Sequence, residues 1–327
     1  MSLTRQVSRL LFVLMAAGGL LIVAAAAHAD DAGADQPGDY LSGSLNYDGL
    51  TRTFHYYLPT SYDGSEPLPV VLDFHGYFSS GHGQRNNSRF DRVAEAEGFI
   101  AVFPDGTPVP DDMRNPAFDG AQYHWYSTGA DDVGFVEALI DNLDRELNID
   151  TSRVYAAGMS NGGGMALKLG LELTDRIAAV AVVSSGSHRA LMTEHIEAGR
   201  GLSRPFSFIL SVGTADDGAY GPHEDRVGVD DVIAYFIAAI GADEEAEVTH
   251  WPATDDDETS IRRYVHGNGA RGTEVVLYQV AGGGHTWPGG PQYLPADRIG
   301  PVSTHLDQSA EIWRHFERQS LHGELGP

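Results

Sequence analysis

The 327-residue chain contains no cysteine, so disulfide bonds, thiol catalysis and cysteine-ligated metal sites are excluded. It is also poor in basic side chains: 21 Lys and Arg residues face 46 Asp and Glu residues, for a net charge of −25. Lys168 is the only lysine. Because binding to a phosphate backbone requires a basic surface, nucleic acid is not expected as a partner. With 42% hydrophobic residues the chain is long enough to bury a substantial core.

The first 29 residues have the pattern of an export signal. Arg5 and Arg9 precede the apolar stretch 10–26, and Ala27-His28-Ala29 forms a small-residue cleavage site. The polar residues 30–39 are predicted to be a disordered lead-in. The pattern therefore predicts a secreted protein, extracellular or periplasmic, without stable membrane association once the signal is removed. An uncleaved membrane anchor is the alternative, because the apolar stretch is long for a signal.

Apolar runs typical of buried strands alternate with segments of helical periodicity along residues 40–320. The expected strands are 68–74, 99–103, 153–157, 177–183, 206–212 and 274–280, after a hairpin over 41–58 that turns at Asp48-Gly49. The expected helices are 90–97, 132–147, 163–173, 229–240 and 306–318. This alternation predicts an α/β fold with a mostly parallel central sheet and helices on both faces. No linker divides residues 40–320, so they are predicted to form a single domain.

Gly158-Met159-Ser160-Asn161-Gly162 reads G-x-S-x-G between a strand-like run and a helix-prone run. In this context the pattern indicates a nucleophile elbow, a sharp turn that holds the serine hydroxyl away from the backbone. The flanking glycines fit such a turn, because a Cβ there would collide with the neighbouring strand or helix. Ser160 is therefore the candidate nucleophile.

A serine hydroxyl needs a histidine base that is oriented by a carboxylate, and with this motif the acid precedes the histidine in the chain. His285 is the candidate base, because it follows an expected strand in a glycine-rich loop. Asp216, which also follows an expected strand, is the candidate acid, and the pattern alone separates it poorly from Asp217. His315 and His322 are expected at the surface.

The tetrahedral intermediate of acyl transfer requires backbone N–H donors for its oxyanion. Asn161, directly after the nucleophile, and Tyr77, in the loop after the expected strand 68–74, are the candidate donors. Trp125 and Trp287 lie close to these motifs in the sequence and are predicted to contact the acyl group of the substrate. Plain core packing is an equal alternative for Trp125.

Six stretches carry a resemblance to a known family: Leu72–Tyr77, Phe103–Gly106, Asp131–Phe135, Val154–Gly163, Gly213–Asp216 and Gly283–Gly290. Together they resemble the secreted polyhydroxybutyrate-depolymerase and feruloyl-esterase group of α/β-hydrolases, over about residues 52–316. The resemblance implies the α/β-hydrolase fold for a catalytic domain over 40–320, esterase activity, and a triad of Ser160, Asp216 and His285. The chain departs from the group in lacking the cysteine pairs that its members often carry.

Patterns for cofactors and metals are weak in this sequence. Gly267–Gly272 matches G-x-G-x-x-G, but a strand rather than a helix is expected after it, so a hairpin loop is predicted. His223-Glu224 lacks the second histidine of a zinc helix. The acidic run Asp255–Glu258 is expected to be a solvated loop, with a calcium site as the lesser alternative. No cofactor or metal is therefore expected.

The main prediction is a secreted serine carboxylesterase that hydrolyses hydroxyalkanoate esters of the polyhydroxybutyrate type, as polymer or oligomer, through an acyl-enzyme. Feruloyl or acetyl xylan esterase activity on plant polysaccharide is the first alternative. A peptidase or an acyltransferase on the same scaffold is the second. A catalytically silent binding protein is disfavoured, because every position that the chemistry requires is filled. The expected partner is thus an ester substrate, and the oligomeric state stays open.

Overall fold

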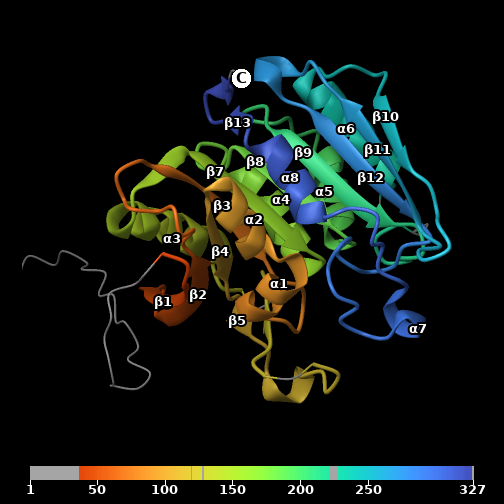
Figure 1. Ribbon diagram of the computed structural model, residues 1–327. Coiled ribbons are helices and arrows are strands. Elements are labelled where there is room, and N and C mark those ends of the chain that lie inside the picture. Colours follow the sequence, from red (N-terminus) through yellow and green to blue (C-terminus); the bar gives the residue numbers. More distant parts are fainter. Residues whose placement is uncertain (1–36, 119, 127–128, 221–226, 326–327) are drawn as a thin grey trace, which may run out of the picture.

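The computed structural model describes residues 37–118, 120–126, 129–220 and 227–325 (Figure 1). The predicted signal at 1–29 and most of the predicted lead-in lie outside the described residues. Within the described ranges, no helix is long and apolar enough to cross a membrane.

A ten-stranded sheet has the order β1-β2-β4-β3-β7-β8-β9-β12-β11-β10. Its six central strands are parallel: β4 (Ile100–Pro104), β3 (Leu68–Phe74), β7 (Ile149–Met159), β8 (Ala179–Val183), β9 (Ser207–Gly213) and β12 (Val275–Ala281). Antiparallel strands extend the two edges: β1 (Tyr40–Tyr47) and β2 (Leu50–Tyr57) on one side, β11 (Ser260–His266) and β10 (Glu247–Trp251) on the other. Because the central strands run the same way, their carboxyl ends meet at one edge of the sheet, where sites in such folds are built.

Helices cover both faces of this sheet (Figure 1). Those packed on one face are α3 (Asp132–Glu146), α4 (Asn161–Glu172), α5 (Ser187–Glu197) and α6 (Val229–Ile240). Those packed on the other are α2 (Phe90–Glu97) and α8 (Gln308–Phe316). The remaining elements are α1 (Gly81–Ser88), α7 (Ala296–Ile299), two 3-10 turns (Asp111–Met113 and Ala270–Gly272) and two short strand pairs, β5 (Thr107–Pro108) with β6 (Tyr123–His124) and β13 (Gln319–Ser320) with β14 (Gly323–Glu324).

Strand β3 illustrates why the central runs are mostly apolar. Val70, Leu72 and Phe74 pack into the core under α3 to α6, whereas Val71 packs into the core under α2 and α8. Successive side chains of a strand point to opposite faces, so a strand covered on both faces is mostly apolar. The exception in β3 is the buried Asp73, whose carboxylate accepts hydrogen bonds from the side chains of Gln84 and Ser88 in α1. The sequence-based prediction of a mostly parallel sheet with helices on both faces is confirmed.

The predicted hairpin at the first edge is also confirmed. Asp48 and Gly49 join β1 to β2 with φ angles of 46° and 77°. Positive φ at both central residues is the signature of the tight turn that an Asp-Gly pair favours.

Four of the longer elements, α1, α5, β10 and β11, were not anticipated from the sequence, and their composition explains why. Helix α1 reads GHGQRNNS and has no apolar stripe; its N-cap is Ser80, whose hydroxyl accepts a hydrogen bond from the Gly83 N–H at 3.1 Å. Strand β10 is half-exposed at the edge of the sheet, and its partner β11 is only partly buried. Helix α5 has polar and apolar residues mixed without a clear period.

Candidate active site

Ser160 lies in the sharp turn between β7 and α4 and has φ 56° and ψ −120°. A non-glycine residue in this conformation is strained, which is expected for a nucleophile elbow. The Ser160 N–H donates to the carbonyl of Val183 at 2.9 Å, which holds the turn against β8. A Cβ at Gly162 would lie 2.0 Å from the Phe74 carbonyl oxygen, so the turn can exist only with glycine there. The predicted elbow is therefore confirmed as a structural feature.

The structure brings His285 and Asp216 together, although they are far apart in the chain. The Asp216 carboxylate lies 2.6 Å from Nδ1 of His285. Asp216 follows β9 and His285 follows β12, and these two strands are parallel neighbours. Asp216 is buried and also accepts from the Ala219 N–H, whereas Asp217 is exposed. The geometry thus separates the two acids that the sequence pattern could not.

A cavity of about 620 Å³ is lined by both Ser160 and His285. Among the described residues no hydrogen bond joins the Ser160 hydroxyl to the imidazole, a contact that often tightens only when substrate binds. The backbone of His285 is held on both sides. Its backbone N–H donates to the Ile299 carbonyl at 2.5 Å, and its backbone carbonyl accepts from the Tyr293 hydroxyl at 2.9 Å. His285 therefore faces the cavity from an anchored loop.

The two candidate oxyanion donors flank the nucleophile. Asn161 is the first residue of α4, so its N–H has no acceptor within the helix. A Cβ at Gly76 would lie 3.3 Å from Cβ of Ser160, which places the Gly76–Tyr77 peptide beside the nucleophile. Within the described ranges, neither the Tyr77 N–H nor the Asn161 N–H donates to another backbone carbonyl. Both amides are thus available to an oxyanion, and their role in catalysis stays a prediction.

The expectation that Trp125 contacts the substrate needs correction, because its side chain is fully buried and does not line the cavity. The indole N–H donates to the His75 carbonyl at 3.0 Å, and the backbone N–H donates to Oδ1 of Asn161 at 2.8 Å. Its ring packs edge-on against Phe74. Trp125 therefore connects the loop after β3 to the elbow.

The same correction applies to Trp287, which is 1% exposed and also lies outside the cavity lining. Its indole N–H donates to the Ser309 hydroxyl at 3.1 Å, and that hydroxyl donates to the Ser88 carbonyl. Its ring packs against Phe90. Trp287 thus fastens the His285 loop to α8 and α2. Trp125 and Trp287 lie near the site motifs in the sequence, but this proximity does not determine whether their indole rings face the cavity or the core.

Apolar side chains from loops and from the end of α7 line the cavity instead: Phe78, Phe118, Tyr293, Leu294 and Ile299. The rings of Phe78 and Phe118 lie 6.1 Å apart. Polar side chains of α1 and of the two residues before it also line the cavity: Ser79, Ser80, His82, Gln84, Asn86 and Asn87. These residues could not be identified from the sequence, because neither the loops nor α1 has an apolar periodicity that would place a side chain in a cavity.

The acidic run 255–258 is not wholly solvated as predicted, because Asp257 is buried. Its carboxylate accepts hydrogen bonds from the backbone and side chains of Thr259 and Thr304. Burial alone would raise the pKa of Asp257, but these hydrogen bonds outweigh it and lower the pKa to about 2. Asp257 thereby ties the turn before β11 to residues 303–304, which run beside the His285 loop.

No group of side chains that could hold a metal ion is found among the described residues, and His223-Glu224 lies outside them. The glycine-rich stretch 267–272 is followed by β12 and contains a 3-10 turn. It is therefore a loop between antiparallel strands, as predicted, and not the start of a nucleotide-binding helix.

Comparisons with known proteins agree with this geometry. Residues 46–287 match the family model described as "Putative esterase". The chain is 32% identical over 269 residues to the "Putative esterase NocK" of Nocardia uniformis subsp. tsuyamanensis, covering 76% of this chain and 74% of that one. It is 28% identical over 232 residues to "Feruloyl esterase B" of Piromyces equi, covering 69% of this chain but only 41% of that one.

Among solved structures, an S-formylglutathione hydrolase from Agrobacterium tumefaciens superposes with a TM-score of 0.54 over 87% of this chain and 97% of that one. The sequence identity is 16%, so this likeness bears on the fold alone. Three observations indicate an esterase with the α/β-hydrolase fold: the mostly parallel sheet, the strained serine at the end of β7 and the match to the esterase family model. The chain belongs to the esterase family and is a serine carboxylic ester hydrolase with the α/β-hydrolase fold.

Proposed function

We propose that this esterase hydrolyses acyl esters carried by plant polysaccharides, in particular feruloyl esters, with Ser160, His285 and Asp216 as its catalytic triad. The observation that carries the proposal is that a strained serine and a carboxylate-paired histidine line one cavity. The proposed nucleophile, its base and the group that orients the base thus lie at the carboxyl ends of the parallel strands β7, β12 and β9.

The chemistry follows from the roles of these groups. His285 accepts the Ser160 proton as the hydroxyl attacks the ester carbonyl, and Asp216 fixes the imidazole through Nδ1 and stabilises its charged form. The N–H groups of Tyr77 and Asn161 stabilise the oxyanion. The alcohol leaves with the proton from His285, and water then repeats the sequence on the acyl-enzyme. No metal or cofactor takes part in these steps.

The choice of substrate rests on two observations. One relative is named a feruloyl esterase, which favours acylated polysaccharide over the hydroxyalkanoate polyester that the motifs first suggested. The cavity also has apolar walls at Phe78, Phe118 and Leu294, which suit a flat aromatic acyl group. Its polar side at α1 suits the hydroxyl groups of a sugar.

We also infer from residues 1–29 that the protein is exported and cleaved after Ala29, which sequencing of the mature amino terminus will test.

The test is a substrate panel of methyl ferulate, acetylated xylan and short hydroxybutyrate oligomers, with a p-nitrophenyl ester and a peptide as general probes. We expect the highest kcat/KM for methyl ferulate, and no turnover of the peptide. A preference for hydroxybutyrate oligomers would overturn the proposed substrate but not the mechanism. Failure of a fluorophosphonate probe to label Ser160 would overturn the mechanism.

A further inference from the structure

His75 is a buried histidine that the catalytic steps above do not use. It follows β3, its side chain is fully shielded from solvent, and both ring nitrogens have backbone partners. The Gly106 N–H donates to Nε2 at 3.0 Å, and Nδ1 lies 2.8 Å from the Gly76 carbonyl oxygen. In the sequence it lies within Leu72–Tyr77, one of the stretches that carry the family resemblance.

These two contacts determine which nitrogen carries the proton. A backbone N–H can only donate, so Nε2 must be unprotonated to accept from Gly106. A carbonyl oxygen can only accept, so Nδ1 carries the proton and donates to Gly76. Burial lowers the pKa of His75 to about 4, although the bond to Gly76 opposes that shift, so the ring is neutral at neutral pH.

The carbonyl that receives this bond belongs to the peptide unit between Gly76 and Tyr77. In a planar trans peptide the C=O and the following N–H point in opposite directions. A hydrogen bond that fixes the direction of the Gly76 C=O therefore also fixes the direction of the Tyr77 N–H. A donor bound to the carbonyl further polarises the peptide and strengthens its N–H as a donor.

The other partner of His75 is itself firmly held. Gly106 follows Asp105, a buried residue whose carboxylate accepts from the Gly81 N–H at 2.7 Å and from the Thr53 hydroxyl at 2.6 Å. A Cβ at Gly106 would lie 2.2 Å from the His124 carbonyl oxygen, so this loop packs tightly against its neighbour. The His75 ring is therefore fastened to a rigid support on its Nε2 side.

We propose that His75 is a positioning residue for the oxyanion hole: its Nδ1–H fixes the Gly76–Tyr77 peptide so that the Tyr77 N–H points toward the oxygen that becomes charged. The inference rests on the proposed acyl-transfer mechanism. His75 does not touch the substrate, since it is buried and does not line the cavity.

The test uses two substitutions that each keep one of the two contacts. In His75→Asn the side-chain amide can lie where Nδ1 lay and donate to Gly76. In His75→Gln the longer side chain can reach the position of Nε2 and accept from Gly106, but its amide is placed poorly for Gly76. We expect kcat for p-nitrophenyl acetate to fall about 100-fold in His75→Gln and about 10-fold or less in His75→Asn, because loss of one oxyanion donor costs about 10²- to 10³-fold. KM should change less than about threefold in both, since the contact acts mainly in the transition state.

A merely structural role predicts a different outcome, in which the kcat of both variants falls in proportion to the loss of Tm, with no rescue by asparagine. That result would overturn the inference. Long-range ¹H–¹⁵N NMR of the wild-type protein gives a test that needs no variant: a proton on Nδ1 of His75 supports the inference, and a proton on Nε2 overturns it. Ser160→Ala, assayed in parallel, separates the two levels, because turnover in that variant would refute the acyl-transfer mechanism itself.

Discussion

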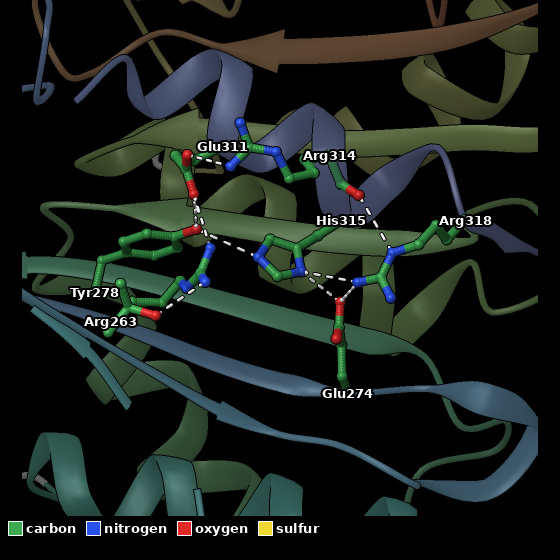
Figure 2. A network of polar contacts seen from close by, with 8 residues as sticks. Arg263, Glu274, Tyr278, Glu311, Arg314, His315 and Arg318 are labelled. Carbon is green, nitrogen blue, oxygen red and sulfur yellow. Dashed lines mark hydrogen bonds and ion pairs between the residues drawn. The ribbon is translucent and has the colours of Figure 1, made fainter. Parts of the chain in front are cut away.

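Two histidine–carboxylate pairs lie at opposite ends of strand β12. At the carboxyl end, Nδ1 of His285 lies 2.6 Å from Asp216. At the amino end, Nδ1 of His315 lies 2.5 Å from Glu274, the residue just before the strand. The first pair faces a cavity, and the second is enclosed between α8 and the sheet (Figure 2).

The two pairs differ in whether Nε2 of the histidine has a protein partner. Nε2 of His315 lies 3.3 Å from the Tyr278 hydroxyl, and that hydroxyl donates to Glu311. Arg318 adds a further donor to Glu274 at 2.6 Å (Figure 2). The His315 side chain is 5% exposed, against 27% for His285.

A histidine–carboxylate pair is thus not in itself a catalytic unit. His285 lines a cavity together with a strained serine, so its remaining nitrogen can take part in proton transfer. At His315 both nitrogens are occupied by protein groups, so the pair can only stabilise the fold. Four substitutions test whether the two pairs differ in this way.

The largest effect is expected for Ser160→Ala, which removes the nucleophile and leaves the amino-end pair intact. Hydrolysis of p-nitrophenyl acetate should fall by about 10⁴-fold or more. The free energy of unfolding, measured with urea, should not decrease, because alanine adds no bulk to the turn. A variant that kept a tenth of the wild-type kcat would contradict the assignment of Ser160.

Next in size is Asp216→Asn, compared with its neighbour Asp217→Asn as a matched control. Loss of the carboxylate that orients His285 should lower kcat by about 10²- to 10⁴-fold. The exposed Asp217 makes no contact with His285, so its variant should retain kcat within about twofold. Equal activity of the two variants would show that the choice between these acids is wrong.

Glu274→Gln tests the opposite end of the strand. Burial would raise the pKa of Glu274, but the contacts with His315 and Arg318 outweigh it and lower the pKa. Removing the charge should reduce the free energy of unfolding at pH 7 by about 2–3 kcal/mol, with kcat unchanged. Because a lowered pKa stabilises the fold only above the pKa of the unfolded chain, the difference from wild type should shrink as the pH falls below about 4.

The exposed Glu324, whose carboxylate lies 3.7 Å from Arg318, offers a control for that experiment. Glu324→Gln should change the free energy of unfolding by less than about 0.5 kcal/mol. A loss of kcat in Glu274→Gln without a loss of stability would mean that the two ends of β12 are coupled in catalysis.

The smallest effect is expected for Trp287→Phe. The substitution removes the hydrogen bond to Ser309 and some buried area, at a cost of about 1–2 kcal/mol in the free energy of unfolding. Because the indole does not line the cavity, KM for methyl ferulate should stay within about twofold of the wild-type value. A tenfold rise in KM would restore the original expectation of direct contact.

The triad candidates could be predicted because each lies in a local pattern whose order along the chain is informative. G-x-S-x-G, the aspartate after β9 and the glycine-rich loop after β12 needed no knowledge of distant packing. Core packing was an open alternative for Trp125, and the structure decides for it. The buried position of Trp287 could not be predicted in this way, because it depends on distant parts of the fold that pack against it.

The prediction for His315 was wrong for a different reason, because the sequence did contain a pattern that indicates its burial. It was expected at the surface, yet it is buried. Ile312, His315 and Phe316 follow the i, i+3, i+4 spacing of one helix face, and the two apolar residues mark that face as buried. Its carboxylate partner, Glu274, lies 41 positions earlier and could not be paired with it without the sheet register.

The place of β12 in the sheet has a consequence for how activity arises during synthesis. This strand inserts between β9 and β11, although both precede it in the chain. A nascent chain that has been made only through β11 contains Ser160 and Asp216 but neither the strand nor the base that follows it. During synthesis, hydrolysis should therefore appear only after β12 and the His285 loop have been made and the strand has inserted between its two neighbours.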